Sequence, residues 1–154
     1  MTAASYDREN IFAKILRGEI PSHKLYEDDR CLAILDIFPV NLGHLLVIPK
    51  AEAVLATELE PGLAAHLFTV GVRLSKALRR AAPRCEGVNF WISDGAPAGQ
   101  EVPHVHLHVI PRFNGDGFGW RSGPNNRQPQ EPAVLKSLAE ALKTALEPGS
   151  RDGA

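Results

Sequence analysis

Residues 103–112 read Pro-His-Val-His-Leu-His-Val-Ile-Pro-Arg, so that His104, His106 and His108 are separated by single apolar residues. In a β-strand alternate side chains share one face, and residues two apart stand about 6.6–6.8 Å from each other. The pattern therefore predicts a strand with three imidazoles on a solvent-facing surface. The interleaved valine and leucine side chains are expected to enter a core.

The length and composition of the chain limit the classes of protein to consider. Its 154 residues suit one domain, and 44% hydrophobic with 23% charged residues exclude wholesale disorder. A formal charge of −1 provides no general field for nucleic acid or an anionic membrane. Without a long apolar run, the chain is expected to be cytoplasmic, and Cys31 and Cys85 are expected to be reduced.

Hydrophobic periodicity predicts an α+β fold, a five-stranded antiparallel sheet with a short N-terminal helix, a long central helix and a C-terminal helix. The first helix is expected after the N-cap Asn10 and before Gly18. The expected strands cover 23–27, 30–37, 44–49, 87–94 and 103–112, and the long helix covers 61–82. The expected divisions are a tail (1–9), a core (10–112), a Gly/Pro-rich loop (113–132), a C-terminal helix (133–147) and a second tail (148–154).

Three chemical interpretations fit the histidine strand before any relative is considered. The histidines could lie on an exposed strand face without any chemical role. They could bind zinc, although the nearest carboxylates are Asp94 and Glu101 and neither cysteine has a familiar ligand spacing. They could also act on phosphorus, because neutral imidazole is a nucleophile at neutral pH. The chain has no P-loop motif, which favours metal-free attack by histidine.

Residues 99–112, Gly-Gln-Glu-Val-Pro-His-Val-His-Leu-His-Val-Ile-Pro-Arg, resemble the signature of the histidine triad (HIT) superfamily. Residues 10–21, 35–39 and 43–50 also resemble its first helix and nucleotide-contacting strands, so the likeness covers roughly residues 8–112. The loop 115–118 is similar to the bacterial and fragile-histidine-triad branches. The resemblance implies a HIT-like fold.

The resemblance also implies a mechanism. His106 would attack the α-phosphorus of a nucleotide conjugate to form a nucleotidyl-histidine, which water then hydrolyses. His108 would contact the phosphate and the leaving group, and His104 would orient the nucleophile. Gln100 would offer its amide to the phosphate or the leaving group. The expected substrates are nucleoside phosphoramidates, dinucleoside polyphosphates or adenylylated small molecules, and the alternative is a nucleotide-binding regulatory protein with weak or no turnover.

For the nucleotide site, the resemblance assigns Asp36 to the ribose hydroxyls and matches His44 to a family histidine near the site. Ser93 stands where relatives usually carry Asn or Gln. Asn10 and Ala13 replace the cysteines with which many bacterial relatives bind zinc, so no metal or other cofactor is expected; a zinc-dependent enzyme is a third hypothesis. The positions matched to the purine-base pocket are Phe12, Ile15, Ile20, Ile34, Ile37 and Leu46, all of which would be equally at home in a core.

The long helix also suggests an assembly. Its apolar stripe suffices to cover a sheet, but Phe68 and Val72 lie off that stripe and would meet water in a monomer. The resemblance likewise implies a homodimer through this helix. The alternative is that the C-terminal helix of the same chain covers Phe68 and Val72.

Overall fold

The computed structural model describes residues 6–119 and 129–146. The chain divides into two compact units: one holds everything described from Tyr6 to Phe118, and the other contains the C-terminal helix. The strands are β1 (Lys24–Glu27), β2 (Cys31–Leu35), β3 (Leu45–Pro49), β4 (Gly87–Trp91) and β5 (Leu107–Arg112). The helices are α1 (Ile11–Leu16), α2 (Pro61–Ala81) and α3 (Pro132–Leu146), with short 3-10 helices η1 (Ala56–Glu58) and η2 (Ala96–Ala98).

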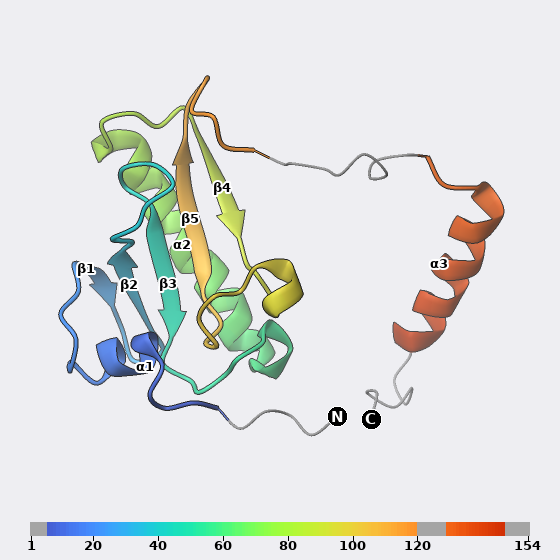
Figure 1. The fold of residues 1–154 in the computed structure, drawn as a ribbon, viewed down its shortest axis with the longest axis horizontal. Coiled ribbons are helices and arrows are strands. Elements are labelled where there is room, and N and C mark those ends of the chain that lie inside the picture. Colours follow the sequence, from blue (N-terminus) through green and yellow to red (C-terminus); the bar gives the residue numbers. More distant parts are fainter. Residues whose placement is uncertain (1–5, 120–128, 147–154) are drawn as a thin grey trace. The chain divides into compact units, whose positions relative to one another are not determined.

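The five strands form one antiparallel sheet in the order β1-β2-β3-β5-β4, which confirms the predicted α+β fold. Helix α2 lies along one face of this sheet (Figure 1). Helix α1 packs on residues of the opposite face. The sheet therefore separates two layers of side chains, one packed against α2 and the other against α1.

Strict alternation along the central strands assigns each side chain to one of these layers. In β2 and β3, Ala33 and Val47 face α2, whereas Ile34 and Leu46 face α1. The predicted stripe of α2 is buried against the first layer, and its members are Leu63, Leu67, Val70, Leu74 and Leu78. Gly71 permits the close approach of α2, since an added Cβ would lie 2.8 Å from Leu107 Cδ2.

Two local predictions about helix ends are confirmed. Asn10 caps α1, because its side-chain oxygen accepts a hydrogen bond from the Ala13 amide at 2.9 Å. Gly18 has a φ of +78°, a backbone conformation that favours glycine, and lies just beyond the helix. Helix α1 is thus fixed at both ends although it spans only 6 residues.

The expectation of three histidines on a solvent-facing strand is wrong. Strand β5 begins only at Leu107, which pairs with Val47 of β3, so His104 and His106 precede it. The segment before β5 instead binds across the chain, with the Val105 amide donating to the Ala53 carbonyl at 2.9 Å. As a result the side chains of His104 and His106 are buried, at 0% and 7% exposed.

Other boundaries differ by a few residues. Strand β2 ends at Leu35 rather than at 37, because the Asp36 side chain accepts the Phe38 amide and turns the chain. Strand β4 ends at Trp91 rather than 94. Several parts of the expected divisions lie outside the described residues. They are residues 1–5 of the first tail, residues 120–128 of the loop, residue 147 of the expected C-terminal helix and the whole second tail, 148–154. None of the described helices combines the length and apolar character that a membrane span requires.

The beginning of the expected Gly/Pro-rich loop is well ordered by polar contacts. Both carboxylate oxygens of Asp116 accept hydrogen bonds from the Arg112 guanidinium, at 2.6 and 2.7 Å. Asp116 also accepts from the Asn41 amide at 2.8 Å, and Arg112 binds the Phe118 carbonyl. These contacts hold Phe118 beside the sheet, where its ring lies 6.3 Å from that of Trp91.

Candidate active site

A cavity of about 560 Å³ opens on the α1 side of the sheet. Most residues assigned to the site from the sequence line it, although they come from α1, β2, β3, β5 and the connections between them. The lining residues that were predicted are Phe12, Ile15, Ile20, Ile34, Asp36, Ile37, His44, Leu46, Ser93, His106 and His108. His104 and Gln100 do not line the cavity.

The orientation of His106 fixes its tautomer. Its Nδ1 lies 2.7 Å from the backbone carbonyl oxygen of His104, which can only accept a hydrogen bond. Nδ1 therefore carries the proton and Nε2 keeps its lone pair. Burial lowers the pKa of His106 below 6.5, although the His104 carbonyl and the nearby Asp36 oppose this shift. The ring is a neutral imidazole at neutral pH.

His108 and His44 form a directed pair. The Val40 amide donates to His44 Nδ1 at 3.2 Å, so the proton of His44 resides on Nε2. This nitrogen lies 2.9 Å from His108 Nδ1 and donates to it, which places the proton of His108 on its own Nε2. The hydrogen bonds from Val40 through His44 thus leave His108 Nε2–H available as a donor. The ring centroids of His108 and His106 lie 4.6 Å apart.

The same burial keeps this pair uncharged. Desolvation is the main cause that lowers the pKa of His108 to about 3, and the proximity of His106 and His44 lowers it further. Burial also lowers the pKa of His44, against the opposing effect of Asp36, whose Oδ2 lies 3.4 Å from His44 Nδ1. At neutral pH His108 can therefore offer a proton for hydrogen bonding without being an imidazolium.

The ring of His104 lies outside the cavity and is hydrogen-bonded on both nitrogens. Its Nε2 donates to the Pro49 carbonyl at 2.9 Å, and its Nδ1 accepts a hydrogen bond from the Tyr6 hydroxyl. Both ring nitrogens are therefore used by the protein, and the carbonyl of the same residue holds His106. Tyr6 was not identified from the sequence, since nothing in the N-terminal segment indicates a contact with a residue 98 positions away.

Gln100 is likewise engaged by backbone groups. Its Oε1 accepts from the Gly95 amide and its Nε2 donates to the Val54 carbonyl, both at 2.8 Å. These bonds fix the connection between β4 and β5 rather than direct the amide into the cavity. Ser93 does line the cavity, and its Oγ accepts a hydrogen bond from Trp91 Nε1 at 3.0 Å.

The apolar part of the cavity belongs to the core as well. Phe12, Ile15, Ile34 and Leu46 are buried together with other core residues, yet also line the cavity. Ile37 is different, because it is 68% exposed at the rim. The buried members therefore belong to the core and also line the cavity, and their contact with a base stays a prediction.

The cavity is also lined by residues that were not assigned to the site from the sequence. Trp91 and Phe118 line it together with the carboxylate-bearing Glu101. Phe118 follows the Gly-Asp-Gly motif that the resemblance had singled out, so a signal for its position was present. Trp91 pairs with His108 in the sheet register, which is a contact between two strands that the sequence analysis did not predict.

A group of possible metal ligands at this site combines two histidines considered in the sequence analysis with Asp36, rather than with Asp94 or Glu101. Ligand atoms of Asp36, His44 and His108 lie within 4.8 Å of one another. The side chain of Asn10, at a position where relatives carry a zinc-binding cysteine, is used to cap α1, and Ala13 is buried.

The family model described as "HIT domain" matches residues 17–115. A HIT-like protein of Borreliella burgdorferi is 46% identical over 130 residues, which are 84% of this chain and 92% of that protein. The adenosine 5'-monophosphoramidase hnt1 of Schizosaccharomyces pombe is 38% identical, with 88% of this chain and 97% of that protein covered. The adenylylsulfatase HINT3 of Arabidopsis thaliana is 39% identical over 74% of this chain, but only 57% of that protein is covered.

Solved structures agree with these relatives. A HIT family protein of Bacillus subtilis superposes with a TM-score of 0.79 at 36% identity, covering 92% of this chain and 99% of the other. A zinc-bound histidine triad family protein of Mycobacterium smegmatis gives a TM-score of 0.69 at 38% identity, covering 89% of this chain and 97% of the other.

Proposed function

Because the chain belongs to the HIT domain family, we propose that it is a nucleotide hydrolase or transferase that cleaves nucleotide conjugates at the α-phosphate. The observation that carries this proposal is the hydrogen bond from His106 Nδ1 to the His104 carbonyl, since it leaves Nε2 unprotonated in the cavity. Relatives named as a phosphoramidase and an adenylylsulfatase support this reaction class. Phosphoramidates, dinucleoside polyphosphates and adenylylated small molecules are the candidate substrates.

Two displacements at phosphorus would complete the reaction. In the first, the Nε2 lone pair of His106 forms a bond to the α-phosphorus while the bond to the leaving group breaks and takes its electron pair with it. In the second, a water oxygen attacks the same phosphorus, the bond to Nε2 breaks, and the water loses a proton to the medium. Dividing one difficult displacement into two easier ones is the advantage of covalent catalysis.

His108 is proposed to assist as a neutral donor. Its Nε2–H is directed by the chain of hydrogen bonds from Val40 through His44, and it lies next to the nucleophile. It can therefore donate to a phosphate oxygen or to the departing group. A bound phosphate would also raise the pKa of His108, because a negative charge favours the protonated imidazole.

The nucleoside is proposed to occupy the α1 end of the cavity. Asp36 uses Oδ1 to accept the Phe38 amide, and its Oδ2 lies near His44, so this carboxylate is held at the rim where it could accept ribose hydroxyls. The apolar side chains of Phe12, Ile34 and Ile37 would then contact a purine base. Ser93 is proposed to face the phosphate, with a shorter reach than the Asn or Gln of relatives.

Gln100 and His104 are proposed to act by positioning. Their side chains are bound to backbone groups and to Tyr6, so in this geometry neither offers a free group to substrate. His104 would hold the tautomer of His106 through its carbonyl. Gln100 would hold the connection that includes Gly99, which lines the cavity.

A homodimer is proposed to form through α2 and the adjoining edge strand. Phe68 is 53% exposed and its ring lies 5.3 Å from that of Phe90 on β4, the last strand in the order of the sheet. These two rings form an apolar patch with exposed area on both elements. Two-fold pairing is the commonest arrangement of soluble assemblies, and such a patch on both copies would be self-complementary.

Turnover with trapping of the intermediate tests the function. The protein is incubated with an adenosine phosphoramidate and, separately, with a diadenosine polyphosphate, quenched within one turnover and digested for mass mapping of the nucleotidylated residue. Adenylate on His106, absent from a His106→Ala variant, is the expected result. A label on another histidine would contradict the assignment, and binding without turnover of either substrate would favour the alternative of a nucleotide-binding regulator.

A further inference from the structure

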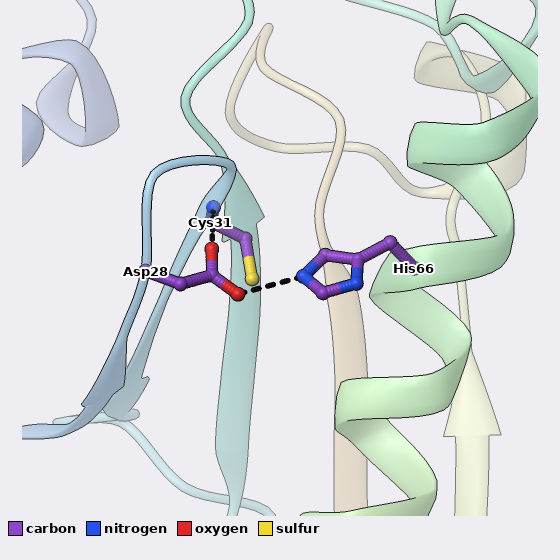
Figure 2. Close-up of side chains that lie close together, drawn as sticks. All are labelled: Asp28, Cys31 and His66. Atoms are coloured by element: carbon purple, nitrogen blue, oxygen red, sulfur yellow. Dashed lines mark hydrogen bonds and ion pairs between the residues drawn. The ribbon is translucent and has the colours of Figure 1, made fainter.

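Asp28, Cys31 and His66 gather three kinds of metal-binding atom in one place outside the cavity. Figure 2 shows the Cys31 thiol, at the start of β2, directed toward the Asp28 carboxylate and the His66 ring of α2. Asp28 Oδ2, Cys31 Sγ and His66 Nε2 all lie within 4.8 Å of one another. None of the three residues lines the cavity of the proposed active site.

The protein orients the central ligand before any ion binds. Asp28 Oδ1 accepts the backbone amides of Arg30 and Cys31 at 2.8 and 2.7 Å, which fixes the plane of the carboxylate. The other oxygen, Oδ2, is thereby turned toward His66 Nε2, 2.7 Å away, and also accepts the Tyr26 hydroxyl at 2.6 Å. Hydrogen bonds that orient a ligating carboxylate are a regular part of metal sites in proteins.

We propose that Asp28, Cys31 and His66 bind a divalent transition-metal ion, with zinc as the ion that this ligand set suits best. Nitrogen, sulfur and carboxylate oxygen are the ligands of zinc, and three protein ligands leave one tetrahedral position for water. Binding would release the thiol proton to solvent, since a coordinated cysteine is deprotonated. The proton that His66 Nε2 shares with Asp28 would move through solvent to Nδ1 of the same ring, which frees the Nε2 lone pair for the ion. The charges of thiolate and carboxylate then balance those of the ion.

The geometry requires only a small adjustment. In a tetrahedral zinc site, oxygen and nitrogen ligands stand about 3.4 Å apart. The Asp28 to His66 contact would therefore lengthen by roughly 0.7 Å as the ion replaces the shared proton. The side chains of Asp28 and His66 are 20% and 25% exposed, so they can move and admit an ion from solvent. Cys31 is buried and would close the inner side of the site.

Such an ion would connect the turn between β1 and β2 to α2. This connection is separate from the reaction at His106 and from the positions where zinc-binding relatives carry cysteines, which are Asn10 and Ala13 here. The expectation from the sequence was that the protein binds no metal at all, and the proposed site departs from that expectation. Metal at Asp28, Cys31 and His66 would therefore stabilise the domain without taking part in turnover.

Cobalt absorption tests the site, because a cobalt–thiolate bond gives a charge-transfer band that oxygen and nitrogen ligands do not. The metal-free full chain is titrated with Co²⁺, and Zn²⁺ is then added to displace it. The variants are Cys31→Ser and His66→Gln, and the controls are Cys85→Ser and His23→Gln, which change the other cysteine and an exposed histidine outside the cluster. Circular dichroism confirms that each metal-free variant is folded.

One equivalent of Co²⁺ is expected to produce the thiolate band, and Zn²⁺ to abolish it. Cys31→Ser should remove the band, His66→Gln should weaken affinity about 100-fold or more, and the two controls should match the parent. A parent without the band, or one whose band is lost in Cys85→Ser, would overturn the proposal. Should Cys31→Ser fail to fold, unaltered affinity in His66→Gln would overturn it as well.

Discussion

Replacing His108 with asparagine is expected to make the stability of the protein less sensitive to acid. Burial, followed by the proximity of His106 and His44, lowers the pKa of His108 from 6.5 to about 3. A histidine with a lowered pKa in the folded state takes up its proton first in the unfolded chain. The free energy of unfolding therefore has its full value, as far as His108 is concerned, above pH 6.5. It decreases progressively as the pH falls toward 3.

The size of this effect follows from that pKa. Each pH unit inside the window costs about 1.4 kcal/mol, so lowering the pH from 6.5 to 5 removes about 2 kcal/mol through His108 alone. Asparagine does not titrate, and its side-chain oxygen can still accept the hydrogen bond from His44 Nε2. The loss of stability between pH 7 and pH 5 should thus be about 2 kcal/mol smaller in His108→Asn than in the parent.

Urea unfolding at pH 7 and pH 5 measures this difference. The buffers contain no phosphate, because an anion in the cavity would raise the pKa of His108 and shrink the effect. His23→Gln serves as the control, since His23 is an exposed histidine outside the cavity. An equal loss of stability in the parent and in His108→Asn would refute the argument that His108 is held neutral by burial.

Asn10→Ala removes the cap of α1 and the hydrogen bond from Asn10 Nδ2 to the Asp7 carbonyl, so it should lower the unfolding free energy by about 2 kcal/mol. Asn10→Asp keeps the capping acceptor and should lower it by about half as much. Equal losses in urea unfolding would contradict the cap. His106→Ala should abolish turnover and also lower stability by about 1–3 kcal/mol, because it leaves the His104 carbonyl without its donor; retained turnover would exclude His106 as nucleophile. Phe68→Asp should convert a dimer into a monomer by light scattering, while a chain ending at Pro132 stays dimeric; a monomeric parent removes the dimer. EDTA should leave the rate of turnover unchanged, and a rate lost with EDTA and restored by Zn²⁺ would require a metal in the reaction.

Local sequence signals were sufficient for most of the fold. The apolar runs of β2 and β3 and the stripe of α2 each depend on neighbours within one element, and the structure buries these residues in the core. The cap at Asn10 is local in the same sense, since donor and acceptor are three residues apart. Where one element determines a contact, periodicity and residue type contain the necessary information.

The surroundings of the triad could not be derived in this way. His104 is buried because its ring binds the Pro49 carbonyl and the Tyr6 hydroxyl, both far away in the sequence. The amide of Gln100 is held by Val54 in the same manner. Strand alternation alone predicts three equivalent imidazoles, whereas these long-range bonds engage both ring nitrogens of His104 with the protein, in keeping with the orienting role that the resemblance implies.

The register of the sheet determines on which face of the sheet His108 lies. His108 stands opposite Leu46 in β3 and Trp91 in β4, so its side chain shares the face on which α1 packs, while Leu107 and Val109 face α2. A slip of one residue would turn His108 toward α2 and Leu107 toward the cavity. Because Gly71 of α2 lies directly against Leu107, that slip would also place an imidazole where the helix leaves almost no space. The close packing of α2 therefore selects the register that presents His108 to the cavity, and the residues that stabilise the sheet also determine where the proposed donor lies.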